Sequence, residues 1–288
     1  MKYDLFVSDF DGTLVKADGT ISEHTKQVIA KYRARGGIFT ICTGRMVPSI
    51  LPRARELGIT SGPVIAFQGS VVYDMGTEQV LSSGHFPLQA ALSLIRMLEA
   101  EKLHIHIYTV WHLYTNLRDE MLVLYEKVCG VKAEVPQCPL SEFAEREKLD
   151  IVKVLVMVEP EKREALRERL SQSLGKEYYV TSSSDWLVEV MPAGENKGKA
   201  VTFLSQYYHI PQERIAAAGD QLNDLPMLEA AGGKFAVSNG VEALKRAATL
   251  IPSNEEDDVA YALEQYVMKG PSPEGGQQRM NTFFRPSR

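Results

Sequence analysis

The chain has 288 residues, of which 44% are hydrophobic and 24% charged, ordinary values for a globular protein with a large core. Its formal net charge is −5 and it has no long basic run, which argues against nucleic acid as the main partner. We expect neither a signal peptide nor a membrane span, because no apolar stretch approaches the roughly 20 residues that a bilayer requires. Three cysteines without a CxxC pair favour a reducing compartment, so we expect a cytoplasmic protein with no membrane partner.

The first apolar run, residues 5–7, ends in two acidic residues. Asp9 and Asp11 stand two positions apart, and Gly12 lets the backbone turn out of the strand. In an extended chain both carboxylates would lie on the same side, which is unfavourable for like charges unless a cation or a proton separates them. Hard divalent cations suit such a pair, although a plain Asp-Gly turn is the common alternative.

The chain then alternates between helical and strand patterns. Apolar residues at helical spacing follow Ser22, a residue type that caps helices, and continuous apolar runs follow each helical segment. This β-α-β-α-β order predicts an α/β fold with a doubly wound parallel sheet, in which ligands bind at the carboxyl ends of strands. We expect helices over residues 23–35 and 46–57 and strands over 5–8, 37–42 and 64–67.

A second polar cluster follows the second predicted strand. Thr43, Gly44 and Arg45 stand at a strand's carboxyl end, as Asp9 and Asp11 do. A lone Thr-Gly pair more commonly caps a helix, so this cluster acquires a functional meaning only from the motifs around it.

Beyond residue 84 the pattern changes to helices interspersed with short alternating strands. This pattern predicts an inserted α+β domain with a largely antiparallel sheet. The final stretch is rich in Pro, Gly and Gln, which is typical of a flexible tail. We expect a sheet domain over residues 1–84 and 188–270, an inserted domain over 85–187 and a flexible tail over 271–288.

Two further motifs follow the insert. Lys197 stands directly before a glycine and ahead of a predicted helix, and Lys199 is the alternative lysine two positions on. The string AAAGDQLNDLPML then places Asp220 at the carboxyl end of a strand of small apolar residues. Asp224 could be merely an N-cap of the next helix, but Asp220 has no capping role and adds a third acid to the pair after the first strand.

The four strings DFDGTL, TGR, NKGKA and GDQLNDLPML, with an insert of this size between the second and third, resemble the haloacid dehalogenase superfamily. Within it the chain is most similar to the Cof-type sugar-phosphate phosphatases, which carry a C2-type cap. The resemblance implies a Rossmann-like core and a cap that determines substrate specificity.

The resemblance also implies an activity: Mg²⁺-dependent hydrolysis of small phosphomonoesters through an aspartyl-phosphate intermediate. Asp9 would be the nucleophile and Asp11 the general acid and base, while Lys197 would stabilise the phosphoryl group. The phosphate would be bound by Thr43, Gly44, Arg45 and Asn223, and the metal by Asp9, Asp11 through its backbone carbonyl, Asp220 and Asp224.

Alternatives remain open at this point. A phosphohexomutase-like phosphotransferase would share the chemistry, and a non-catalytic protein could bind the same small phosphorylated metabolite as partner. Two residues depart from the Cof-type pattern, since Gln68 stands where Asn is usual and Asp258 where Gly is usual. We expect the first departure to affect substrate preference rather than chemistry. The chain is expected to be a monomer or a homodimer.

Overall fold

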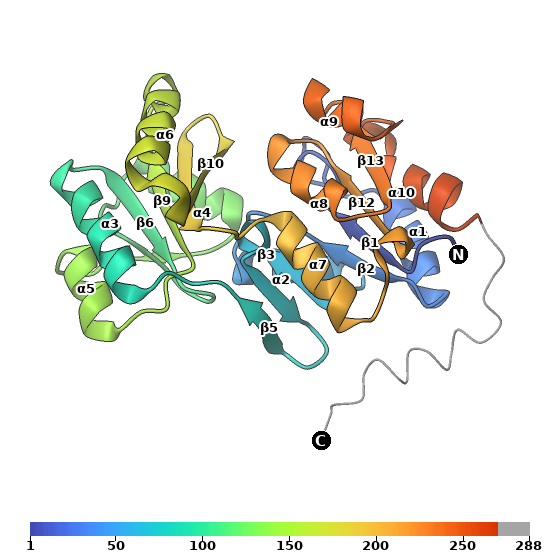
Figure 1. Cartoon of the computed structure of the whole chain (residues 1–288), viewed down its shortest axis with the longest axis horizontal. Helices are drawn as coiled ribbons and strands as arrows, with labels where there is room; N and C mark the ends of the chain where they lie inside the picture. The colour runs from blue at the N-terminus through green and yellow to red at the C-terminus, as the bar shows by residue number, and fades with distance from the viewer. Residues whose placement is uncertain (270–288) are drawn as a thin grey trace. The chain divides into compact units, whose positions relative to one another are not determined.

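The computed structural model describes residues 1–269, which form two units, each with its own sheet (Figure 1). The first unit contains Met1–Thr43, Arg53–Gln79 and, of the described residues, 196–269. The second contains Gly44–Pro52 and Val80–Glu195. The tail predicted over 271–288 lies outside the described residues. Within the described part of the chain, no helix has the length and apolar character needed to cross a membrane.

Five parallel strands form the main sheet of the first unit. They are β1 (Leu5–Ser8), β2 (Ile38–Ile41), β12 (Ile215–Gly219), β13 (Gly233–Val237) and β14 (Thr249–Ile251). Their order is β14-β13-β12-β1-β2. The central strands are short apolar runs with every residue buried, as expected for a parallel sheet covered on both faces. Because β1 and β12 are neighbours, with Ser8 opposite Ala218, the residues that follow these two strands meet at one edge.

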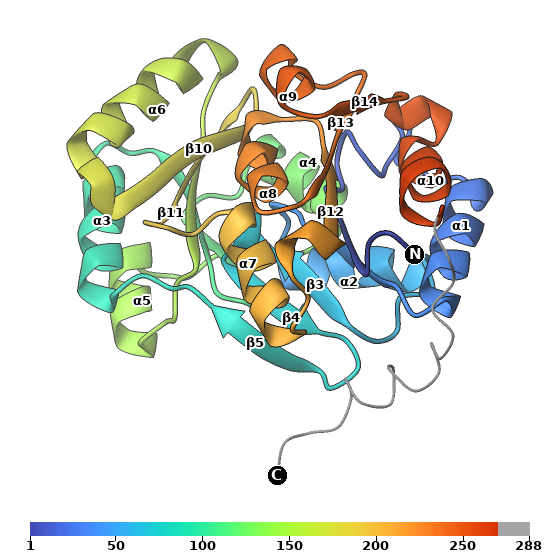
Figure 2. The same ribbon diagram turned by 45° about the vertical axis from the view of Figure 1, so that its right-hand side comes forward.

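Helices lie on both faces of this sheet, which confirms the expected doubly wound arrangement. They are α1 (Glu23–Ala34), α7 (Lys197–Tyr207), α8 (Leu225–Glu229), α9 (Glu242–Ala247) and α10 (Asp258–Ala262). In Figure 2, α7 and α8 lie on one side of β12, and α1 and α10 lie together on the other. Helix α1 begins where expected, since the Ser22 hydroxyl accepts a hydrogen bond from the Thr25 amide at 3.0 Å.

A three-stranded sheet follows helix α2 (Val47–Glu56). It consists of β3 (Pro63–Ala66), β4 (Val71–Asp74) and β5 (Gln79–Ser83), in that order. Strand β3 pairs antiparallel with β4, whereas its parallel contact to the main sheet is an isolated bridge between Cys42 and Ile65. The prediction therefore located this strand correctly but not its principal partner. A short 3₁₀ turn, η1 (Phe67–Gly69), joins β3 to β4.

The second unit contains a six-stranded sheet of order β10-β11-β9-β6-β7-β8. Its strands pair antiparallel, except that β7 and β8 are parallel. The predicted antiparallel character is thus confirmed. The strands are β6 (His104–Tyr108), β7 (Leu113–Thr115), β8 (Ala133–Glu134), β9 (Lys153–Met157), β10 (Tyr178–Ser184) and β11 (Leu187–Pro192).

Four helices accompany this sheet: α3 (Leu88–Ala100), α4 (Glu120–Cys129), α5 (Leu140–Glu147) and α6 (Pro160–Leu174). Helices α3, α5 and α6 bury apolar residues in one core against the same face of the sheet, and Figure 1 shows them on that side. Tyr125 of α4 contacts Tyr108 and His106, which alternate with the core-facing residues of β6, so α4 covers the opposite face.

The two units divide the chain at 195/196 rather than at the expected 187/188. Strand β11 pairs with β9 and β10, so the chain remains in the second unit up to Glu195. The other boundary lies at 79/80 rather than 84/85, and residues 44–52 also cluster with the second unit. The physical reason is that an apolar run such as residues 187–191 suits a buried strand in either sheet, and its hydrogen-bonding partner is not visible in the sequence.

A buried ion pair lies on the sheet face of the second unit that α4 covers. Lys153 Nζ is 2.8 Å from Glu189 Oε1, each side chain is 2% exposed, and the ammonium lies 4.7 Å from the Tyr108 ring centre. Such a pair contributes little relative to apolar residues, but removing one member leaves an uncompensated buried charge.

We expect Lys153→Met to lower the free energy of unfolding by ~3 kcal/mol, because Glu189 then stays buried without its ion-pair partner. Urea unfolding followed by circular dichroism measures the loss, and adding Glu189→Gln should recover much of it. Lys162→Met is the matched control, since its pair with Glu159 is exposed. A loss below about 1 kcal/mol for Lys153→Met would contradict this account.

Helix α10 begins with a buried acid. Asp258 is 2% exposed, and its Oδ2 atom has no hydrogen-bond partner within residues 1–269. Burial raises the pKa of Asp258 to about 8, partly opposed by a hydrogen bond from the Val259 backbone. Asp258, which stands where glycine is usual, is therefore harder to ionise in the folded protein than in the unfolded chain.

Asp258 ionises more readily in the unfolded chain than in the fold. The free energy of unfolding therefore falls as pH rises from about 4 through about 8. We expect Asp258→Asn to remove this dependence. Between pH 5 and 8 the free energy of unfolding of the wild type should fall by on the order of 3 kcal/mol more than that of the variant. Urea unfolding at both pH values measures the difference. Asp257→Asn, at the half-buried neighbour, is the control and should keep most of the wild-type slope, because Asp257 is only a minor cause of the raised Asp258 pKa.

Candidate active site

Strand β1 delivers Asp9 to the carboxyl edge of the parallel sheet in the first unit. Asp9 is buried, whereas Asp11 is exposed. The backbone of Asp11 forms an isolated bridge with Val15, in a loop that has already left the strand direction. The two acids therefore occupy different environments rather than one shared face of a strand, because the strand ends at Ser8.

The loop after β1 also holds Asp220. The Thr13 hydroxyl donates to Asp220 Oδ1 at 3.0 Å, and a Cβ on Gly12 would lie 2.6 Å from Asp220 Oδ2. Gly12 has φ of +86°, and its carbonyl accepts a hydrogen bond from Asn239 Nδ2 at 2.8 Å. Only glycine allows this approach. Sequence reasoning missed the role of Thr13, for which a hydroxyl directly after the Asp-Gly pair was the available signal.

Helix α7 begins with Lys197, whose side chain is 1% exposed. Its Nζ atom lies 2.5 Å from Asp9 Oδ1 and 2.5 Å from Asp224 Oδ1. Lys199, the alternative lysine, is exposed one position beyond Gly198. Asn196 caps the helix by accepting a hydrogen bond from the Lys199 amide, which sets the direction in which α7 starts.

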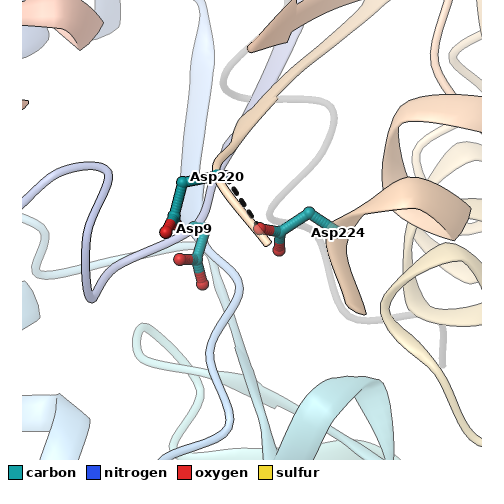
Figure 3. A group of neighbouring side chains, drawn as sticks. All are labelled: Asp9, Asp220 and Asp224. Carbon is teal, nitrogen blue, oxygen red and sulfur yellow. Dashed lines mark hydrogen bonds between the residues drawn. The ribbon is translucent and has the colours of Figure 1, made fainter. Parts of the chain in front are cut away.

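Asp224 is fully buried and accepts hydrogen bonds on both carboxylate oxygens. Oδ1 accepts from Lys197, and Oδ2 accepts from the backbone amides of Asp220 and Gln221 at 2.9 Å each. Figure 3 shows the three carboxylates of Asp9, Asp220 and Asp224 gathered at this edge, with the bond from Asp220 to Asp224 dashed. Asp224 is thus not a simple cap of α8; it connects the lysine to the loop that carries Asp220.

Burial dominates the electrostatics of this cluster. It raises the pKa of Asp9 well above its usual range, as does the neighbouring Asp224, while Lys197 opposes the shift. Burial and Asp224 likewise raise the pKa of Asp220. For Lys197, burial favours the neutral amine, but Asp224 and Asp9 outweigh it and raise the pKa. Each ionised group here therefore depends on opposite charge beside it.

The acidic cluster fits a hard divalent cation. Ligand oxygens of Asp9, Asp220 and Asp224 lie within 4.8 Å of one another, and carboxylate oxygens are the ligands that Mg²⁺ prefers. With all groups ionised, the three carboxylates and the Lys197 ammonium leave a net charge of −2, which a dication neutralises. Asp11 is not among the side chains of this group.

The expected phosphate-binding residues are distributed differently. Thr43 is buried in the first unit, where its amide donates to the Ile65 carbonyl at 3.0 Å. Gly44 and Arg45 cluster with the second unit, and the Gly44 carbonyl accepts a hydrogen bond from Lys153 at 3.3 Å. Asn223 is half-buried in the first unit, directly before Asp224.

Asn223 has a partner that sequence reasoning did not assign. Its Nδ2 donates to Gln68 Oε1 at 2.9 Å, across 155 residues of sequence. The sequence marks Gln68 only as a departure from the Cof-type pattern. Its contact with Asn223 could not be predicted, because a contact between two distant loops leaves no local signal in the sequence.

Comparison with known proteins agrees with this geometry. A family model described as haloacid dehalogenase-like hydrolase matches residues 6–263. The 5-amino-6-(5-phospho-D-ribitylamino)uracil phosphatase YitU of Bacillus subtilis is 30% identical over 273 residues, which cover 91% of this chain and 97% of that protein. The pyridoxal phosphate phosphatase YbhA of Escherichia coli is 27% identical over 90% and 97% of the two chains. The crystal structure of TM0651 from Thermotoga maritima, 31% identical, matches with a TM-score of 0.82 over 91% and 97%.

The family match covers nearly all of the described residues and includes every motif from Asp9 to Asp224. The resemblance to the Cof-type phosphatases is thereby confirmed, as is the α/β fold with a parallel sheet and a separate, largely antiparallel one. The chain belongs to the haloacid dehalogenase-like hydrolase family, and it is a phosphatase.

Proposed function

We propose that this enzyme hydrolyses small phosphorylated metabolites in a Mg²⁺-dependent reaction that passes through an aspartyl phosphate on Asp9. The observation that carries the proposal is the buried cluster in which Lys197 lies 2.5 Å from both Asp9 and Asp224, beside Asp220. With all four groups ionised, the site has a net charge of −2 and repels a phosphate ester, so turnover requires additional positive charge there.

The Mg²⁺ ion would be held by the carboxylates of Asp9 and Asp220 and by the backbone carbonyl of Asp11, and it supplies charge neutralisation at the phosphoryl oxygens. Asp224 would influence the ion through water or through Lys197, because both of its carboxylate oxygens already accept hydrogen bonds, one from Lys197 and one from the Asp220 amide. Thr13 would keep the Asp220 carboxylate in its orientation.

The chain's own residues would perform two successive transfers. A carboxylate oxygen of Asp9 attacks phosphorus in line with the leaving oxygen, and the ester P–O bond breaks as the new bond forms. Asp11, exposed beside the strand end, would give its proton to the leaving oxygen and then take one from the water that hydrolyses the intermediate. Lys197 would keep Asp9 ionised and stabilise negative charge on the phosphoryl group.

The remaining expected residues would bind substrate. Thr43, Gly44, Arg45 and Asn223 are proposed phosphate ligands, and the second unit is proposed to select the leaving group. The substrates in the names of YitU and YbhA, together with sugar phosphates, form the first panel to test. We place the reaction in the cytoplasm, since the free cysteines suit a reducing compartment.

Asp9→Asn should reduce phosphate release at least 10³-fold on every ester that the wild type accepts, because an amide is not a nucleophile for this reaction. Release of inorganic phosphate is measured with Mg²⁺ and with a chelator, and the chelator should abolish wild-type activity. Asp18→Asn, in an exposed turn of the same unit, is the control. Near wild-type activity in Asp9→Asn would refute the mechanism. Phosphate transfer to an added sugar phosphate without release would favour a mutase.

Lys197→Met should lower kcat/KM by about 10²- to 10³-fold, the usual effect of removing one group that stabilises charge in the transition state. Lys199→Met is a closely matched control, two residues away on the same helix but exposed, and should change kcat/KM less than twofold. The assignment of the lysine would be wrong if the two variants lost activity equally.

A further inference from the structure

Three consecutive residues after strand β3 have left-handed backbone conformations. Phe67 has φ of +50°, Gln68 of +57° and Gly69 of +100°. For residues with a side chain this conformation is unfavourable, and it persists only where the surrounding structure holds it in place. Turn η1 is therefore a strained segment whose contacts need an explanation.

The backbone of this turn touches two segments that carry proposed site residues. The Gln68 amide donates to the Thr43 carbonyl at 2.9 Å. Gly69 packs so closely against the start of helix α7 that a Cβ would lie 2.2 Å from the Asn196 carbonyl oxygen and 2.8 Å from the Lys197 amide nitrogen. The turn thus connects the loop after β2 to the residue that delivers Lys197.

The side chain of Gln68 reaches a third segment. It is 2% exposed, and its Oε1 accepts the 2.9 Å hydrogen bond from Asn223 Nδ2. A carboxamide is planar, so fixing one N–H of Asn223 also fixes the direction of its second N–H and of its Oδ1. Neither of these forms a hydrogen bond with residues in the described part of the chain. Both are therefore available to water or to a ligand.

We propose that Gln68 is a positioning residue, which holds the Asn223 carboxamide in the orientation that binds a phosphoryl oxygen. The inference rests on the proposed function, in which Asn223 is a phosphate ligand. It explains why a buried glutamine occupies a strained turn position: asparagine, usual here in similar proteins, is one methylene shorter than the side chain that makes this contact.

Two variants separate positioning from structural support. Asparagine tolerates the left-handed conformation better than glutamine, so the fold of Gln68→Asn should be at least as stable. Its shorter side chain no longer reaches Asn223, so the hydrogen bond between them is lost. Gln68→Met keeps the length and removes the polar atoms. We expect each to lower kcat/KM for p-nitrophenyl phosphate about three- to tenfold, mostly through a higher KM, as for one lost hydrogen bond to the bound phosphoryl group.

The double variant tests whether the two residues act together. Asn223→Ala should lose at least as much activity as Gln68→Met, and combining them should cost no more than Asn223→Ala alone. Gln212→Met is the control, because Gln212 also donates a carboxamide hydrogen bond, to the Glu229 carbonyl at 2.8 Å, near the opposite end of β12. Wild-type kcat/KM in Gln68→Asn and Gln68→Met, or losses that multiply in the double variant, would overturn the inference.

A second measurement does not depend on turnover. Calorimetric titration with inorganic phosphate in the presence of Mg²⁺ should give a Kd three- to tenfold weaker in Gln68→Asn than in the wild type, with equal or higher thermal stability. If the wild type binds phosphate but hydrolyses no ester, the proposed function fails, and these dissociation constants still decide the role of Gln68. Equal values would overturn the inference, and absence of phosphate binding to the wild type would overturn both.

Discussion

The site depends on holding three carboxylates and one ammonium together at the end of two neighbouring strands. Strands β1 and β12 are paired neighbours, so the residues that follow them, Asp9 and Asp220 among them, leave the sheet at the same edge. Burial works against this arrangement by raising the pKa of both acids, and Lys197 offsets the effect at Asp9. The backbone and hydrogen bonds around these groups keep the charges at fixed distances.

Backbone geometry, rather than side-chain flexibility, sets those distances. Asp220 Oδ2 lies only 2.6 Å from where a Cβ on Gly12 would be, and the Cβ of Asp224 lies 2.5 Å from the corresponding position on Gly219. Aspartate, with a single methylene, keeps the carboxylate close to a backbone that the sheet already positions. Any residue larger than glycine at these two positions would push the acids apart, which is why the glycines belong to the motifs as much as the acids do.

The parts of the site that follow from strand ends could be predicted from the sequence, and the parts that depend on tertiary contacts could not. Asp9 and Asp220 were recognisable because each follows an apolar run. Strand β11 was assigned to the wrong unit because strand pairing is non-local. The contact of Gln68 with Asn223 joins two loops 155 residues apart, and neither segment alone indicates it.

Asp224 has a role that a simple charge count would not suggest. A third acid makes the repulsion within the cluster worse, and it raises the pKa of Asp9. Yet burial alone would favour neutral Lys197, and Asp224 is the largest contribution that keeps this lysine protonated. Without Asp224 the cluster would have one fewer negative charge, but Lys197 would keep only Asp9 of the two acids that raise its pKa. The four residues are therefore one electrostatic unit, whose remaining charge of −2 is what a dication has to balance, and no single member can be replaced without changing the protonation of the others.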